Sequence, residues 1–155
     1  LPLPPEEPAA APSGVTTTPS TALRVLLVDD DPMVLLSLRQ TLEALGHEVA
    51  VAHGGEAAID ELRRAQQAGR PHQAVLTDFG MPRLHGGQVA RAAKQADPAV
   101  VVLVLTGWGG QADSMREWAP YVDGWIDKPP RLARLREALT LAASLQPGGS
   151  VGTAG

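Results

Sequence analysis

Five short apolar runs, each about as long as a β-strand, alternate with longer amphipathic segments over most of this chain. The runs are rich in valine, leucine and isoleucine, as is typical of parallel strands covered on both faces. Such strands need long crossover connections, usually helices, so the alternation predicts one three-layer α/β domain with an open, parallel, doubly wound sheet. The predicted strands are residues 24–28, 48–52, 73–77, 100–105 and 121–126, and the predicted helices are residues 32–45, 55–68, 87–95, 111–118 and 130–144.

The two ends of the chain differ from this central part. Residues 1–22 are dominated by proline, alanine, serine and threonine, a composition that buries too little apolar surface to offset the entropy of ordering. We therefore predict a disordered linker at 1–22, one domain at 23–144 and a disordered tail at 145–155. The chain begins with Leu1 and not with methionine, so we expect it to be a piece of a longer protein.

Composition excludes several classes of function. The chain has no cysteine, which rules out disulfides, thiolate metal sites and cysteine nucleophiles. Its net charge of −4 argues against nucleic acid as a direct partner, because such binding needs a basic face. No apolar run approaches the roughly 20 residues that span a bilayer, so we expect no membrane contact and a cytoplasmic location.

Unusual polar residues follow the predicted strands. They are Asp29, Asp30 and Asp31 after the first, Asp78 after the third, Thr106 after the fourth, and Asp127 and Lys128 before Pro129 after the fifth. Because parallel strands end at the same edge of a sheet, these groups should converge on one crevice, where ligands bind in such folds. Clustered carboxylates need a cation, and Mg²⁺ fits their oxygen ligands best.

Each of these residues alone has an ordinary structural explanation. Asp31 suits the N-cap of the first helix, and Asp78 precedes a turn-like segment. Lys128 alone would be a solvated charge, Thr106 a strand residue and Trp125 a half-buried packing residue. It is their combination at neighbouring strand ends that indicates a functional site.

With these residues in place, the chain resembles the receiver domain of two-component response regulators. The resemblance rests on residues 25–32, residues 76–82 with Gly86, residues 104–107 and residues 124–129. It spans about residues 23–144 and implies a flavodoxin-like (βα)5 domain that acts as a phosphoprotein in a phosphorelay.

The resemblance also implies roles for individual residues. Asp78 would take a phosphoryl group from a phosphohistidine. Asp30 and Asp78 would bind Mg²⁺ directly, Asp29 directly or through water, and Gly80 through its backbone carbonyl. Such a domain is a signalling module and not an enzyme, since it catalyses only its own phosphorylation.

Three further residues complete the implied switch. Lys128 would pair with a phosphoryl oxygen as a point charge. Thr106 would move its hydroxyl toward the phosphoryl group, with Gly107 leaving room, and Trp125 would rotate with it. The fourth helix, the fifth strand and the fifth helix of the prediction would then form the readout face, with Trp118, Tyr121, Trp125, Arg131, Arg134 and Arg136.

The expected partner is a histidine kinase or a histidine phosphotransfer protein, and the linker-like leader favours the receiver of a hybrid histidine kinase. The main alternative is a haloacid-dehalogenase-like phosphatase with an aspartyl-phosphate intermediate. That family needs a second acid two residues after the nucleophile, where this chain has Gly80. A nucleotide-binding domain of similar topology and a degenerate receiver that only binds proteins are further alternatives.

The chain departs from the commonest receiver pattern at several positions. Gly80 and Trp108 occupy the two places that tune attack by water in this family, and they predict slow loss of the phosphoryl group. His85 stands where a small or acidic residue is frequent, and Pro130 where an aromatic one is common. We expect His85 to lie in an exposed turn and to take no part in metal binding.

Overall fold

The sheet has five strands, and every strand is parallel to its neighbours. The computed structural model describes residues 22–81, 83–107 and 116–144 of the chain. The strands are β1 (Arg24–Asp29), β2 (Glu48–His53), β3 (Ala74–Asp78), β4 (Val101–Thr106) and β5 (Gly124–Asp127). Their order across the sheet is β2-β1-β3-β4-β5, which confirms the predicted open, doubly wound arrangement.

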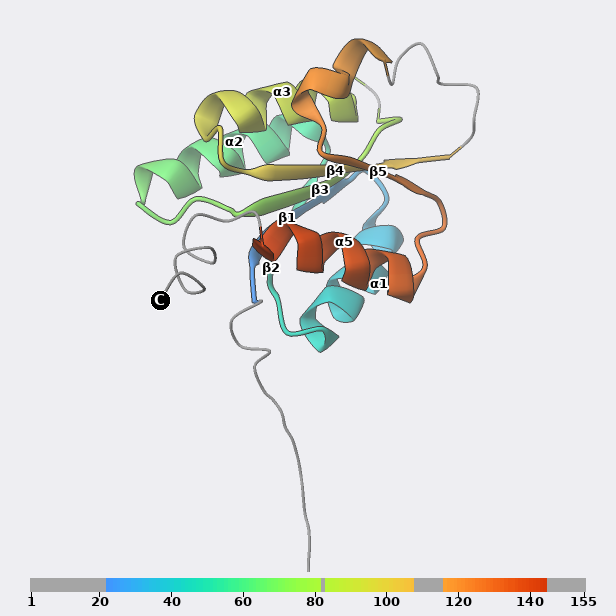
Figure 1. Cartoon of the computed structure of the whole chain (residues 1–155). Helices are drawn as coiled ribbons and strands as arrows, with labels where there is room; N and C mark the ends of the chain where they lie inside the picture. Colours follow the sequence, from blue (N-terminus) through green and yellow to red (C-terminus); the bar gives the residue numbers. More distant parts are fainter. Residues whose placement is uncertain (1–21, 82, 108–115, 145–155) are drawn as a thin grey trace, which may run out of the picture.

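Helices cover both faces of this sheet. They are α1 (Pro32–Ala44), α2 (Gly55–Gln67), α3 (Gly86–Ala96) and α5 (Leu132–Ser144), with a short 3₁₀ helix, η4 (Ala119–Tyr121), before β5. In Figure 1, α2 and α3 lie above the sheet, and α1 and α5 lie below it. Within the described residues, no helix combines the length and the apolarity that crossing a membrane requires.

The alternation of side chains along β1 divides the core into two halves. Val25 and Leu27 belong to the cluster between the sheet and the helices α1 and α5. Leu26 and Val28 belong to the cluster between the sheet and the helices α2 and α3. All four side chains are fully buried. Successive strand residues point to opposite faces, so a strand covered on both sides must be apolar throughout. The continuous apolar run in the sequence therefore follows directly from the three-layer fold.

The first helix begins and ends as its sequence predicts. The Asp31 carboxylate accepts a hydrogen bond from the Met33 N–H at 2.9 Å and caps α1, and Pro32 is its first residue. The chain leaves the helix through Gly46, whose φ of +98° is a conformation that side chains rarely adopt. The Asp31 side chain thus caps α1, although its neighbours in the sequence, Asp29 and Asp30, belong to the carboxylate group predicted at the strand end.

Two predicted boundaries are wrong. Tyr121 belongs to η4 and not to the last strand, because the Val122 N–H donates to the Ala119 carbonyl and closes a turn. The last helix begins at Leu132, two residues later than predicted, with its first helical hydrogen bond from Leu135 to the Arg131 carbonyl. Of the predicted helix 111–118, residues 111–115 lie outside the described residues and 116–118 are helical. The predicted linker, except for its last residue, and the predicted tail also lie outside them.

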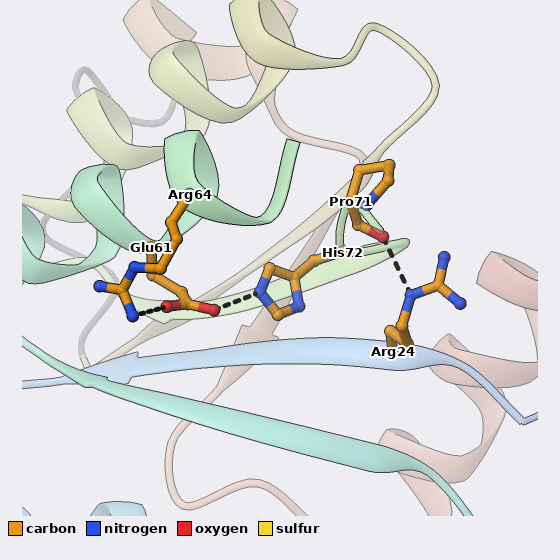
Figure 2. Close-up of polar contacts among 5 residues, drawn as sticks. All are labelled: Arg24, Glu61, Arg64, Pro71 and His72. Carbon is orange, nitrogen blue, oxygen red and sulfur yellow. Dashed lines mark hydrogen bonds and ion pairs between the residues drawn. The ribbon is translucent and has the colours of Figure 1, made fainter. Parts of the chain in front are cut away.

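Polar contacts fasten the opposite end of the sheet, where the strands begin. The Arg24 Nε–H donates to the Pro71 carbonyl at 3.1 Å, which ties the start of β1 to the segment before β3 (Figure 2). His72 is buried and pairs with Glu61 of α2 at 3.1 Å. Glu61 also pairs with Arg64 at 3.1 Å. These contacts hold β1, β3 and α2 together near the amino ends of the strands. The polar residues predicted to form the site lie at the opposite edge of the sheet, at the carboxyl ends of the strands.

His47 should make the stability of the fold depend on pH. Its half-buried ring accepts a hydrogen bond from the Leu23 N–H through Nδ1 at 3.1 Å, and burial lowers the pKa of His47 below its ordinary value of 6.5. As the pH falls below about 6.5, the unfolded chain binds a proton that the folded chain resists, so the free energy of unfolding should decrease. Urea unfolding at pH 7.5 and 5.5 measures this change.

The matched variant for this prediction is His47→Asn, whose side-chain oxygen can accept the same hydrogen bond without titrating. We expect the loss of stability between the two pH values to be smaller in this variant than in the wild-type chain. Equal losses in both proteins would contradict the role of His47.

Candidate functional site

Asp29 and Asp78 are the last residues of the neighbouring strands β1 and β3. From β1 the chain passes under the sheet through α1, and from β2 it passes over the sheet through α2. The carboxyl ends of β1 and β3 therefore lie where the direction of winding reverses, which is the place where open α/β sheets bind ligands. The two carboxylates are buried, with 2% and 5% of their surfaces exposed.

Asp30 completes a cluster of three carboxylates with Asp29 and Asp78. Each offers an oxygen, and these oxygens lie within 4.8 Å of one another. One oxygen of Asp29 accepts a hydrogen bond from the Asp31 N–H at 2.9 Å, and the other is buried with no partner among the described residues. Burial, reinforced by the charge of Asp78, raises the pKa of Asp29 to about 6 against the opposing effect of that hydrogen bond.

This donor set fits a hard divalent cation such as Mg²⁺. Carboxylate oxygens are the ligands that Mg²⁺ prefers, and a cation would offset the repulsion between the two buried carboxylates. The buried oxygen of Asp29 that has no partner among the described residues is the observation that most directly indicates such an ion. Gly80, the fourth predicted ligand, is exposed two residues beyond Asp78.

Lys128 brings a positive charge to the same crevice. Its Nζ lies 2.5 Å from Oδ1 of Asp78, although the lysine side chain itself is 34% exposed. The backbone holds it there, because the Lys128 N–H donates to the Thr106 carbonyl at 2.8 Å, just beyond the last residue of β5. The peptide bond that follows, Lys128–Pro129, is cis. An ammonium group thus directly contacts the buried carboxylate.

Thr106 ends β4 beside this crevice and is buried. Gly107 follows it, and among the described residues, its chain neighbours aside, no heavy atom lies within 4 Å of the place where a Cβ of Gly107 would stand. Trp125 lies on β5, half-buried against the core under α2 and α3. The structure therefore brings Asp29, Asp30, Asp78 and Lys128 into one cluster, with Thr106 at the neighbouring strand end.

Two residues near the site were missed as functional candidates. The Phe79 ring lies 6.2 Å from that of Trp125, and it stacks on His85 with 5.0 Å between ring centroids. His85 is half-buried and caps α3, so the prediction of an exposed turn is wrong. The sequence offered one signal for Phe79, its position directly after Asp78. The contacts of its ring with His85 and Trp125 could not be predicted, because the partners of an aromatic ring depend on tertiary packing.

The chain around the site matches a known family. The response regulator receiver domain family matches residues 25–140, and the chain belongs to this family. It is a receiver domain of the kind found in two-component signalling. Nothing in the comparisons supports the haloacid-dehalogenase-like phosphatase, the main alternative.

Two curated relatives illustrate the family. The chain is 33% identical over 144 residues to the virulence sensor protein BvgS of Bordetella bronchiseptica, covering 88% of this chain and 11% of that protein. It is 35% identical over 121 residues to the response regulator MprA of Mycobacterium avium, covering 76% of this chain and 51% of that protein. The chain thus spans about a tenth of one relative and half of the other.

Solved structures share the fold. A response regulator receiver domain protein from Clostridium thermocellum has a TM-score of 0.70 at 26% identity, covering 79% of this chain and 94% of that one. The receiver domain of the sensor histidine kinase PA1611 from Pseudomonas aeruginosa has a TM-score of 0.65 at 22% identity, covering 79% and 98%. The second likeness concerns the fold alone.

Gly86 should be essential for the geometry of the loop between β3 and α3. A Cβ at this position would lie 2.5 Å from the Asp78 carbonyl oxygen and 2.8 Å from Cα of Phe79. Because both atoms are backbone, we expect Gly86→Ala to lower the free energy of unfolding by about 1–3 kcal/mol. Chemical denaturation measures the change.

Gly80→Ala is the control for this prediction, because in the described part of the chain no heavy atom beyond its chain neighbours lies within 4 Å of the Cβ position of Gly80. Its stability should stay within about 0.5 kcal/mol of the wild-type value. A Gly86→Ala protein as stable as the Gly80→Ala protein would contradict the close approach.

Proposed function

We propose that this receiver domain takes a phosphoryl group from a phosphohistidine onto Asp78, with Mg²⁺, and then changes conformation. The proposal rests on the charged groups that surround the Asp78 carboxylate. Its buried carboxylate contacts the Lys128 ammonium at 2.5 Å and lies with Asp29 and Asp30 in one cluster of oxygens. A buried anion with one cation and two further anions around it is suited to phosphoryl transfer with a divalent metal.

In the reaction, a carboxylate oxygen of Asp78 forms a bond to phosphorus while the bond between phosphorus and the donor imidazole breaks. The imidazole leaves with the electron pair of that bond, and an acyl phosphate remains on Asp78. The Lys128 ammonium pairs with a phosphoryl oxygen, which stabilises the transferred charge. Mg²⁺, held by Asp29, Asp30, Asp78 and the Gly80 carbonyl, would supply the remaining neutralisation of charge.

The conformational change would involve Thr106 and Trp125. Thr106 ends β4, the strand next to β3, and follows Leu105, the residue that pairs with Asp78. Among the described residues, no atom beyond its chain neighbours lies within 4 Å of the Cβ position of Gly107, which would leave the Thr106 side chain room to move. Trp125 lies on the adjacent strand and is only half-buried. A charge added at Asp78 would then bias two arrangements of these side chains.

The proposed partner is a histidine kinase or a histidine phosphotransfer protein, and the proposed context is a cytoplasmic receiver domain within a longer hybrid histidine kinase. The similarity to a small part of BvgS, which is named a virulence sensor protein, supports this context. The receiver domain of PA1611, named a sensor histidine kinase, is described with Mg²⁺ in its active-site cleft, which supports the metal. We propose that the domain is not an enzyme and does not bind nucleic acid directly.

Incubation with acetyl phosphate tests the function directly. We expect one phosphoryl group to be added to the wild-type chain in the presence of Mg²⁺ and none after chelation with EDTA, measured by intact mass spectrometry. Asp78→Asn should abolish the adduct, because an amide is not a nucleophile for this transfer.

The control is Asp31→Asn, because Asp31 only caps α1 and asparagine caps equally well. This variant should form the adduct as the wild-type chain does. A phosphoryl group on the Asp78→Asn chain would refute the assignment, and continuous release of phosphate would favour a phosphatase.

The acyl phosphate should be lost slowly. Gly80 has no side chain to orient an attacking water, and Trp108, the other residue behind this prediction, lies outside the described residues. We expect Gly80→Asn, whose side chain has room at this position, to lose the phosphoryl group faster than the wild-type chain. The decay of the adduct after removal of acetyl phosphate measures both rates, and a wild-type lifetime of seconds with Mg²⁺ would contradict the prediction.

A further inference from the structure

A row of aromatic rings leads away from the phosphoacceptor toward η4. Phe79 and His85 stack with 5.0 Å between ring centroids and 29° between ring planes. The edge of His85 meets Trp118 at 5.0 Å and 75°, and Trp118 lies 6.1 Å from Tyr121. These separations fall in the range at which aromatic pairs attract each other. The row thus connects the residue after Asp78 with the segment before β5.

The first ring of the row is tied to the site through the backbone. Phe79 follows Asp78 directly, and its N–H donates to the Leu105 carbonyl at 3.0 Å. Its own carbonyl accepts hydrogen bonds from Met81 at 3.1 Å and from Gly86 at 2.9 Å. A rearrangement at Asp78 must therefore move Phe79 or strain these bonds.

The middle ring is held in one orientation. Nδ1 of His85 accepts a hydrogen bond from the Gly87 N–H at 3.0 Å, and the His85 N–H donates to the Gln88 side chain at 3.0 Å. These two bonds form a capping box at the start of α3. Because the imidazole is both the cap of α3 and the contact between Phe79 and Trp118, its ring cannot move independently of the helix.

Trp118 is also confined. A Cβ on Gly87 would lie 2.5 Å from its indole ring, so the glycine is what allows the ring to approach α3 so closely. The guanidinium carbon of Arg91 lies 5.4 Å from the ring centroid. Trp118 is half-buried and packs against the core, so a displacement of the His85 ring would press on a side chain that already has close neighbours.

We propose that His85 is a positioning residue whose ring couples the phosphorylation of Asp78 to Trp118, by a route separate from Trp125. This inference rests on the proposed function, since it needs the phosphoryl group on Asp78. Phe79 is the branch point, because it contacts both His85 and Trp125. The second route carries the signal over the start of α3 to the residues just before η4.

Two variants separate the ring of His85 from its capping bond. His85→Asn keeps an oxygen that can accept the Gly87 hydrogen bond but removes the ring. His85→Phe keeps a ring between Phe79 and Trp118 but removes the cap. Arg91→Gln is the control, since it removes the cation beside Trp118 and leaves the row of rings intact.

The indole N–H signals in ¹H–¹⁵N NMR spectra report on the three tryptophans separately, after assignment by single Trp→Phe substitutions. Spectra would be recorded with Mg²⁺ before and after addition of acetyl phosphate, with the adduct on Asp78 followed by mass spectrometry. In the wild-type, Arg91→Gln and His85→Phe chains we expect the Trp118 signal to shift on phosphorylation. In His85→Asn the Trp118 shift should be lost, while the adduct and the Trp125 shift remain.

The outcomes distinguish the inference from the proposed function. An adduct on Asp78 with an unmoved Trp118 signal in the wild-type chain would overturn the inference alone. So would a Trp118 shift that survives in His85→Asn, or one that is lost in His85→Phe. Absence of any adduct on the wild-type chain would overturn the proposed function and the coupling with it.

Discussion

The site is organised around the burial of like charges. Asp29 and Asp78 end neighbouring strands inside the fold, where burial, together with the charge of Asp78, raises the pKa of Asp29. Such a pair persists only because cations and donors surround it, and here these include the Lys128 ammonium and the Asp31 N–H. The open edge of the sheet and the exposed Asp30 leave a place for a further cation.

The remainder of the structure keeps this crevice in shape. Apolar β1 and β3 are clamped between two layers of helices, and the contacts of His72 and Arg24 hold the opposite end of the sheet. The β3–α3 loop is pinned by Gly86, whose Cα approaches the backbone of Asp78 too closely for any side chain. The scaffold around the carboxylate cluster therefore has little freedom to rearrange its backbone.

Much of the fold could be predicted because its signals are local. The apolar runs located the strands to within a residue or so, except that the last strand was extended back to Tyr121, and Asp31, Pro32 and Gly46 marked the limits of α1. The boundaries that were wrong lie around η4, where a hydrogen bond within a turn overrode the apolar pattern, and at the start of α5, where the first helical hydrogen bond runs from Leu135 to Arg131. The roles assigned to Thr106, Gly80 and Trp125 stay predictions, because each role is to bind a ligand or to move after phosphorylation, and a structure of one state without ligands tests neither.

By itself the sequence determined the class of fold and which polar residues end the strands, because strand patterning and connection rules depend on residues close together in the chain. Only the tertiary structure decided that the oxygens of Asp29, Asp30 and Asp78 lie within 4.8 Å, and that Lys128 contacts Asp78 at 2.5 Å. It alone placed the ring of His85 between Phe79 and Trp118. The reason is that contacts between residues far apart in the chain are set by the packing of helices on the sheet, which no local pattern encodes.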